Sequence, residues 1–209
     1  MQRFQLITDI DDTIHPSGNG LLRGIAGIDN RLPNNVLYPC VKELHKAMYD
    51  KYRTNTVIVS ANPFRPDPKK YKDLLRVPVV VYGGGLSSLN SLKGIGGIIH
   101  GPRIYDTMAD EKIKSIRKHK RTHLTSKLIW IGDNGHGDVR VAQELLRTGD
   151  IELAFIHIVN PRRLRRPMNN LIYFQHYGQV LDVLIRSGIL DERVGAACRN
   201  KNFDYARFL

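Results

Sequence analysis

The chain is poor in cysteine, with only Cys40 and Cys198 among its 209 residues. The two stand far apart and show neither the short spacing of a structural metal site nor the repeated spacing of a disulfide framework. This scarcity excludes a small secreted scaffold held together by disulfides. We therefore expect two ordinary free thiols, which is typical of a protein in a reducing compartment.

Long hydrophobic runs are missing as well. No apolar stretch approaches the roughly 20 residues that span a bilayer. The opening stretch MQRFQLITDIDD reaches several aspartates almost at once, which is not the pattern of a signal peptide. There is no internal repeat, low-complexity tract or linker that would divide the chain. We expect one domain over residues 1–209, located in the cytoplasm, with peripheral contact to membranes left open.

Acidic residues are outnumbered by basic ones. Thirty-two Lys plus Arg against 20 Asp plus Glu give a net charge of +12 and an isoelectric point near 9.8. Such an excess favours polyanionic partners, whether nucleic acid, an anionic membrane surface or a phosphorylated substrate, and does not choose among them. The phosphate-binding motif with a Gly-Lys-Ser/Thr end is absent, so nucleotide hydrolysis of that kind is not supported.

Short apolar runs, each followed by an amphipathic segment, determine the predicted fold. The runs are mostly continuous rather than alternating, as in buried parallel strands. They cover Phe4–Thr8, Thr56–Val59, Pro78–Tyr82, Leu128–Ile131 and Leu153–Val159. Helices are predicted over Cys40–Tyr52, Asp110–Lys120, Asp138–Arg147 and the apolar stripe from Tyr177 to Ile185. The alternation predicts a three-layer, Rossmann-like α/β fold with a central parallel sheet of five strands and helices on both faces.

Aspartates follow the first predicted strand directly. In sheets of this kind ligands bind beyond the carboxyl ends of the strands. The segment FQLITDIDDTIHPS places Asp9, Asp11 and Asp12 at that position, followed by Thr13. A tight loop there can turn Asp9 and Asp11 toward one pocket. Taken alone, the same string is equally typical of a turn or a helix cap, because aspartate favours both.

A second acidic segment, IWIGDNGHGDV, follows the fourth predicted strand. It places Asp133 directly after Gly132, and Asp138 five residues later. The glycines in between let the backbone bend closely around a small ligand. Two carboxylates at such a bend are hard oxygen ligands of the kind that Mg²⁺ takes. The alternative is a glycine-rich turn in which Asp138 merely caps the next helix.

Two weaker signals complete the set. Ser60 ends the second strand, where its hydroxyl and the adjacent backbone N–H of Ala61 can hold a phosphoryl oxygen. Lys112 stands in MADEKIKSIRKH near the expected start of a helix. Each has a plainer interpretation, because Ser60 is equally typical of a cap and most lysines like Lys112 are solvated.

Taken together and in this order, the four motifs resemble those of the haloacid-dehalogenase (HAD) superfamily. They are Asp9-x-Asp11-x-Thr13, Ser60 after the second strand, Lys112, and Gly132-Asp133-x-x-x-x-Asp138. Within the superfamily the chain is most similar to the catalytic domain of the actin-patch-type phosphatidate phosphatases. The stretches that carry this likeness are DIDDTI, VSANPF, EKIKSI, IGDNGHGD, LAFIHIVNP and YGQVLDVLIRSGIL. Those enzymes commonly carry GDSG where this chain has GDNG.

The resemblance implies a magnesium-dependent phosphomonoester hydrolase on a HAD fold. It implies that Asp9 attacks phosphorus and becomes an aspartyl-phosphate. Asp11 would protonate the departing oxygen and later take a proton from the hydrolytic water. Asp12 is expected to be structural.

The resemblance also implies how the metal and the phosphoryl group are held. Mg²⁺ would bind to Asp9, to Asp133 and to the backbone carbonyl of Asp11, and Asp138 would support its waters. The phosphoryl oxygens would be held by Ser60, Ala61 and Lys112.

The intervals between the motifs leave no room for a substantial cap domain. The first holds one helix and a Gly- and Asn-rich loop, Ser17–Asn35, and the second, Ala61–Glu111, must supply a strand and a helix of the core. An open site suits a bulky substrate. Two basic stretches lie in the chain, Arg117–His123, which is equally compatible with a solvated helix face, and Arg162–Arg166. We expect a polyanion or nucleic acid to contact the arginines of the second stretch, which are Arg162, Arg163, Arg165 and Arg166.

Three functions remain open on the sequence. The first is a phosphatidate phosphatase-like enzyme that acts on a bulky or lipid substrate. The second is a polynucleotide-end phosphatase with the same chemistry, favoured by the net charge. The third is a basic binding protein on a HAD fold without activity, which the full set of acidic residues and Lys112 disfavours.

Overall fold

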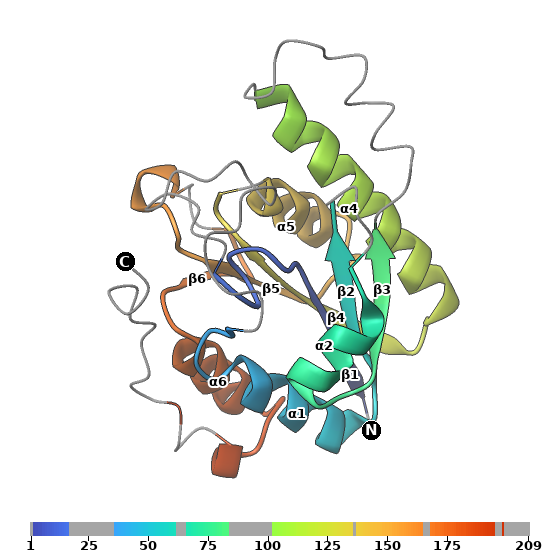
Figure 1. Ribbon diagram of the computed structural model, residues 1–209, viewed down its shortest axis with the longest axis vertical. Helices are drawn as coiled ribbons and strands as arrows, with labels where there is room; N and C mark the ends of the chain where they lie inside the picture. Colours follow the sequence, from blue (N-terminus) through green and yellow to red (C-terminus); the bar gives the residue numbers. More distant parts are fainter. Residues whose placement is uncertain are drawn as a thin grey trace.

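The computed structural model describes residues 2–16, 36–61, 66–83, 102–135, 137–164, 168–194 and 198 (Figure 1). The strands in these segments are β1 (Arg3–Thr8), β2 (Thr56–Ser60), β3 (Val79–Gly83), β4 (Ser126–Asp133), β5 (Leu153–His157) and β6 (Leu171–Phe174). The α-helices are α1 (Val41–Tyr52), α2 (Pro68–Leu75), α4 (Pro102–Thr122), α5 (Asp138–Arg147) and α6 (Tyr177–Arg186). Two 3-10 turns follow, η1 (Pro161–Arg163) and η2 (Glu192–Val194).

One parallel sheet forms the middle layer, with strand order β3-β2-β1-β4-β5-β6. The prediction of a parallel α/β sheet is confirmed, but the prediction of five strands was wrong, because the sheet has six. The additional strand, β6, pairs with β5 through partners such as Ala154 and Leu171. It was missed because its apolar run has only four residues and because a basic segment, rather than a predicted helix, precedes it.

Two apolar cores fill the spaces on either side of the sheet. Successive side chains of a strand point to opposite faces. Leu6 of β1 therefore belongs to the core beneath α1, α2 and α6, and its neighbour Ile7 to the core beneath α4 and α5. The two groups of helices lie on opposite sides of the sheet (Figure 1). Burial on both faces explains why the strands read as continuous apolar runs.

One helix begins well before its predicted range. The helix α4 begins at Pro102 rather than at Asp110, which makes Lys112 a mid-helix residue. Proline suits the first turn of a helix because the N–H it lacks has no partner there. The helix α2 lies in the interval where a helix was expected without bounds, and it begins after Asp67, whose carboxylate accepts a hydrogen bond from the Lys69 N–H at 2.9 Å. The boundaries predicted for α5 are confirmed.

The expectation of two free thiols was wrong. The structure joins Cys40 and Cys198 in a disulfide, although they are 158 residues apart. Cys40 lies at the start of α1, and α6 and η2 pack against α1. The C-terminal part of the fold therefore returns to the beginning of α1, a proximity that the spacing of two cysteines does not reveal. This pairing removes the argument that connected the cysteines with a reducing compartment.

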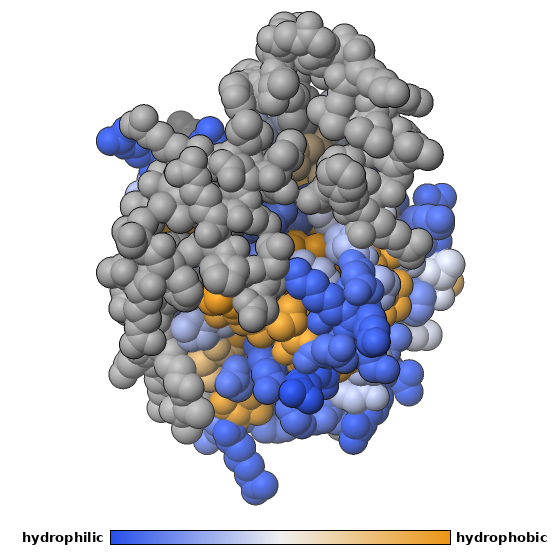
Figure 2. All heavy atoms as spheres, in the orientation of Figure 1, coloured by the Kyte–Doolittle hydropathy of each residue, from blue (hydrophilic) through white to orange (hydrophobic). Residues whose placement is uncertain are grey.

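Few large apolar side chains are exposed among the described residues. Those that are exposed are Leu124 and Leu164. In the space-filling view the described surface over α1 and α2 is mainly hydrophilic, with smaller apolar areas between (Figure 2). Within the described segments, no helix combines the length and apolarity needed to cross a membrane. The Ser17–Asn35 loop and residues 84–101 lie outside these segments, so the absence of a cap domain stays a prediction.

Candidate active site

The ends of two neighbouring central strands bring the first two acidic motifs together. Strands β1 and β4 are paired up to Thr8 and Ile131. One residue beyond that pair, the Asp9 N–H donates to the Ile131 carbonyl at 3.0 Å. Asp133 is the last residue of β4. Because both strands run in the same direction, their carboxyl ends meet at one edge of the sheet, as predicted.

Three buried carboxylates meet at this edge. Asp9, Asp133 and Asp138 each offer one oxygen, and these oxygens lie within 4.8 Å of one another. The residues are 4%, 0% and 0% exposed. Asp138 is the first residue of α5, and its Oδ2 accepts a hydrogen bond from the Asp133 N–H at 3.2 Å. Asp138 is thus both a helix-start residue and part of the acidic group.

Glycine is required at position 132. A Cβ atom there would lie 2.6 Å from the Cβ and Oδ2 atoms of Asp138, which is closer than nonbonded atoms approach. The glycine therefore lets the first turn of α5 lie directly against the end of β4. This contact brings Asp138 beside Asp133.

Lys112 joins the acidic group from α4. Its Nζ lies 2.9 Å from Oδ1 of Asp9 and 2.5 Å from Oδ1 of Asp138. The side chain is 2% exposed, and its Nζ is 6.0 Å from the ring centroid of Trp130 on β4. Lys112 therefore lies beside the predicted acidic residues, and the plainer interpretation as a solvated lysine was wrong. Its contact with a phosphoryl group stays a prediction.

Burial and mutual charge shift the titration of these groups. Burial raises the pKa of the Asp9 carboxyl, while Lys112 opposes the rise. Burial likewise raises the pKa of Asp138 well above its ordinary value. For Lys112, burial alone lowers the pKa, but Asp138, Asp9 and Asp133 outweigh it and raise the pKa. The ammonium therefore stays charged, and the carboxylates are costly to ionise together without further positive charge.

The donor set fits a divalent cation. Three carboxylates face one ammonium in the described part of the site, so full ionisation leaves a formal excess of two negative charges. All the ligand atoms are oxygens, which Mg²⁺ and Ca²⁺ prefer. Asp9, Asp133 and Asp138 would hold the ion. Asp11 does not belong to this group of three, and the metal contact assigned to its backbone carbonyl stays a prediction.

Asp11 and Asp12 occupy different surroundings. Asp11 is half-buried and lies near Tyr71. The pKa of the Tyr71 hydroxyl is raised mainly by burial and, as a smaller cause, by the negative charge of Asp11. Asp12 is 1% exposed, has φ 55°, and its backbone carbonyl accepts a hydrogen bond from Nδ1 of His157 at 2.7 Å. The arrangement of Asp12 agrees with the structural role predicted for it.

Ser60 ends β2 at the same edge of the sheet, and Ala61 follows it. Ser60 is 5% exposed. A Cβ atom at its strand partner Gly83, which has φ 130°, would lie 2.0 Å from the Ser60 carbonyl oxygen, so glycine is needed there. The contact of Ser60 and Ala61 with a phosphoryl group stays a prediction.

Asn134 connects the ends of two strands, which its sequence position did not predict. This side chain is 4% exposed, and its Oδ1 accepts hydrogen bonds from the N–H groups of Val159 and Asn160, both at 2.9 Å. Its Nδ2 donates to the Asn160 carbonyl at 2.7 Å. The only available signal was the asparagine in GDNG. Its partners follow β5, so they became visible only with the strand order.

The two basic stretches have different surroundings. Arg117 is paired with Glu144 at 3.1 Å and with Asp150 at 2.8 Å, so part of the first stretch joins helices α4 and α5. In the second, Arg163 lies at the edge of the acidic site, where its Nη1 donates to the Gly135 carbonyl at 2.7 Å. Arg162 is exposed, and Arg165 and Arg166 lie outside the described residues.

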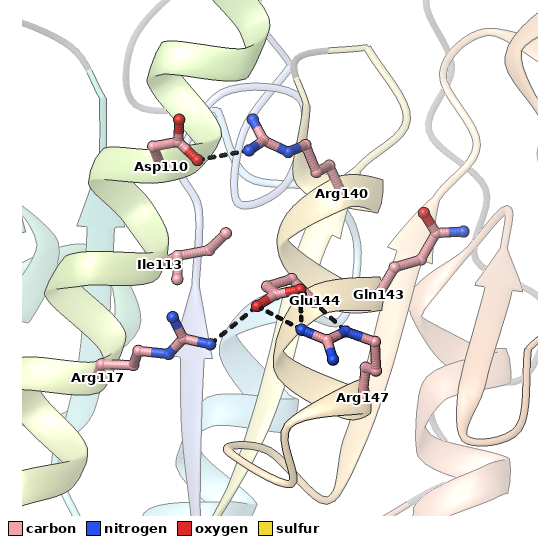
Figure 3. Close-up of a pocket in the computed structure, with 7 residues that line it drawn as sticks. All are labelled: Asp110, Ile113, Arg117, Arg140, Gln143, Glu144 and Arg147. Atoms are coloured by element: carbon pink, nitrogen blue, oxygen red, sulfur yellow. Dashed lines mark hydrogen bonds and ion pairs between the residues drawn. The ribbon is translucent and has the colours of Figure 1, made fainter.

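A separate hollow of about 310 Å³ lies between α4 and α5 and contains none of the predicted site residues. Its lining residues are Asp110, Ile113, Arg117, Arg140, Gln143, Glu144 and Arg147 (Figure 3). Two ion pairs cross it: Arg140 of α5 pairs with Asp110 of α4 at 2.6 Å, and Arg117 of α4 pairs with Glu144 of α5. Arg147 pairs with Glu144 within α5. The two crossing pairs connect α4 with α5, and each of the three arginines has a carboxylate partner.

No protein-family model, curated protein or solved structure matches the chain. The likeness to the HAD superfamily therefore stays a prediction that rests on the motifs and on the arrangement of their side chains.

Proposed function

We propose that this protein is a magnesium-dependent phosphomonoester hydrolase that works through an aspartyl-phosphate on Asp9. One observation carries the proposal: Asp9, Asp133 and Asp138 bring buried carboxylate oxygens within 4.8 Å of one another, and Lys112 bridges two of them. A group of like charges is costly to bury without a function that requires it. The order of the motifs in the sequence supports a reaction of the HAD type.

The first chemical step forms a bond between a carboxylate oxygen of Asp9 and phosphorus and breaks the bond from phosphorus to the leaving oxygen. Asp11, outside the group of three, donates a proton to that oxygen. In the second step Asp11 takes a proton from water, which attacks the phosphorus and releases Asp9 and inorganic phosphate. A positioned acid–base group of this kind contributes about 10²–10⁴-fold to the rate.

Lys112 holds the nucleophile and balances charge. Its bonds to Asp9 and Asp138 orient the Asp9 carboxylate and favour its ionised form. A bound Mg²⁺ would supply the positive charge that offsets the remaining carboxylates and the phosphoryl oxygens. Ser60 and the backbone of Ala61 are proposed to hold the phosphoryl oxygens from the side of β2.

For the substrate we propose a bulky phosphomonoester, with phosphatidate at a membrane surface suggested by the motif likeness. Arg162 and Arg163 are proposed to contact the anionic surroundings of the phosphate. The position of Arg163 beside Gly135 also supports the second candidate, a phosphatase that acts on polynucleotide ends. Both candidates use the same chemistry on Asp9.

The test is hydrolysis of an aryl phosphate with Mg²⁺ and then with excess chelator. We expect phosphate release that needs Mg²⁺ and is lost in Asp9→Asn. Asp73→Asn is the matched control, because this aspartate is exposed on α2. Turnover of Asp9→Asn comparable to wild type, or turnover unchanged by chelation, would contradict the proposal. No hydrolysis by wild type over a broad screen of phosphomonoesters would favour the binding-protein alternative.

A further inference from the structure

Side-chain hydrogen bonds connect the loop after β4 with the loop after β5 at the edge of the acidic site. Asn134, in the loop after β4, makes three hydrogen bonds to the backbone of Val159 and Asn160 after β5. Asn160 in turn accepts a hydrogen bond from the Arg162 N–H at 3.1 Å and so fixes the start of η1. The basic segment is therefore held in place by uncharged groups, and no arginine side chain is needed for these contacts.

Arg163 is separated from the acidic group by a single residue. Its Nη1 donates to the carbonyl of Gly135 at 2.7 Å, and the N–H of the same glycine donates to Oδ1 of Asp133. The guanidinium carbon also lies 5.5 Å from the ring centroid of Tyr105 on α4, an arrangement that favours a cation over the ring face. A Cβ atom at Gly137 would lie 2.6 Å from the Tyr105 carbonyl oxygen, so α4 packs closely on this loop.

Arg163 differs from other arginines near the site in how its charge is paired. Arg117, Arg140 and Arg147 are each paired with a carboxylate. Within the described segments no carboxylate is paired with Arg163, and the Gly135 carbonyl takes one of the five N–H donors of its guanidinium. The side chain is also exposed, whereas the buried Lys112 serves the carboxylates inside.

We propose that Arg163 forms a second phosphate-binding site, so that the substrate carries another phosphate group beside the one that Asp9 attacks. The inference rests on the proposed function and narrows its substrate class. A guanidinium presents a planar pair of N–H donors that matches two oxygens of one phosphate. Contacts with Tyr105 and Gly135 orient this group before the substrate binds, which reduces the entropy lost on binding.

The test compares substrates that differ by one phosphate. Wild type and Arg163→Gln are assayed on a nucleoside 3′,5′-bisphosphate and on the matching monophosphates, and a 5′-phosphorylated oligonucleotide and phosphatidate vesicles are tested in parallel. We expect the kcat/KM of wild type to be about tenfold higher for the bisphosphate, mainly because its KM is lower. The monophosphates lack the second phosphate and therefore lose one charge-assisted hydrogen bond to Arg163. In Arg163→Gln the ratio should fall to about one, and Arg163→Lys should recover part of it.

Arg193→Gln is the matched control, because Arg193 is also an exposed arginine in a 3-10 turn. It should keep the wild-type ratio. Equal use of mono- and bisphosphate by wild type, a preference that survives in Arg163→Gln, or a preference for phosphatidate vesicles that does not depend on Arg163 would overturn the inference while leaving the proposed hydrolysis intact.

Direct binding separates the inference from catalysis. Isothermal titration calorimetry of wild type with the bisphosphate and with the monophosphates should show the same tenfold difference in Kd, lost in Arg163→Gln. If the titrations show this difference and no substrate is hydrolysed, the second phosphate site stands and the proposed function fails. If the Kd values are equal, the inference fails.

Discussion

Lys112 lies 2.5 Å from Asp138, and both side chains are buried where α4 meets the start of α5. The same ammonium reaches Asp9 at 2.9 Å. A single lysine thus connects the end of β1 with the start of α5. Because the buried carboxylates already outnumber this ammonium, removal of Lys112 leaves Asp9 and Asp138 without this positive partner.

Lys112→Met tests this balance. Without the ammonium two buried carboxylates lose their partner, so we expect the free energy of unfolding to fall by about 3–5 kcal/mol in chelator. The kcat for an aryl phosphate should fall by about 10²–10³, the usual loss for one group that stabilises transition-state charge. Urea unfolding and steady-state kinetics measure the two effects.

Lys114→Met is the control for this variant, because Lys114 is an exposed residue of the same helix. It should leave both measurements near wild type. A Lys112→Met protein with unchanged stability and unchanged kcat would show that the ammonium has no part in the site.

Asp133→Asn tests the metal centre with a small change. The amide oxygen can still accept the hydrogen bond that Asp133 receives from the Gly135 N–H, while one of three like charges is removed. In chelator we expect Tm to stay the same or rise, since like charges in a buried site repel. The rise in Tm that Mg²⁺ gives to wild type should be lost, because ligands stabilise only the state that binds them.

A fluorescence titration gives a second measurement for the same variant. Trp130 is the chain's single tryptophan, and Nζ of Lys112 lies 6.0 Å from its ring centroid. Its emission should therefore change as Mg²⁺ is added to wild type and not change in Asp133→Asn. An equal response in both proteins would mean that the ion binds elsewhere.

Because the disulfide stabilises the fold, we expect the free energy of unfolding to fall when a thiol reductant is added. Cys198→Ala opens a covalent loop with a sequence separation of 158 residues, and native disulfides typically stabilise by about 2–4 kcal/mol. Urea unfolding without reductant should show that loss, and wild type and variant should coincide when a thiol reductant is present. A wild-type protein that reacts with two equivalents of thiol reagent under native, non-reducing conditions would contradict the pairing.

Because His45 is buried in its neutral form, we expect the protein to lose stability in acid. This histidine is fully buried, its Nδ1 pairs with the Thr56 hydroxyl at 2.9 Å, and burial lowers its pKa to about 3. Because the folded-state pKa is below the unfolded value of about 6.5, protonation favours the unfolded chain. The contribution is complete above pH 6.5 and is lost as pH falls toward 3, by about 1.4 kcal/mol per pH unit for one proton.

The measurement is the free energy of unfolding between pH 7 and pH 5 in wild type and in His45→Gln. The slope of wild type should exceed that of the variant by an amount that grows as the pH falls and approaches one bound proton near pH 5. His15, whose pKa burial lowers to about 4, remains in both proteins and contributes equally to each slope. Equal slopes would show that His45 is not buried in its neutral form.

Patterns within short segments predicted much of the fold. The continuous apolar runs predicted β1 to β5 because strands buried on both faces have no polar side. The acidic residues were correctly expected at one edge, since parallel strands end together. The amphipathic pattern also predicted the helix α1, whose buried residues include Val41, Leu44 and Met48.

Contacts between distant segments were the part that the sequence did not predict. The Cys40–Cys198 pair depends on how α6 and η2 pack on α1, and no local pattern reports that packing. Strand β6 is held by its pairing with β5 more than by its own short sequence. The hydrogen bonds of Asn134 likewise need β4 and β5 to be neighbours.

The most direct test of the central claim is mass spectrometry of protein that has been quenched in acid during turnover of a phosphomonoester with Mg²⁺. The account predicts that the peptide containing Asp9 gains the mass of one phosphoryl group, and that the gain is absent with chelator and in Asp9→Asn. Turnover without any phosphorylated protein, or a phosphoryl group on a peptide that lacks Asp9, would contradict it.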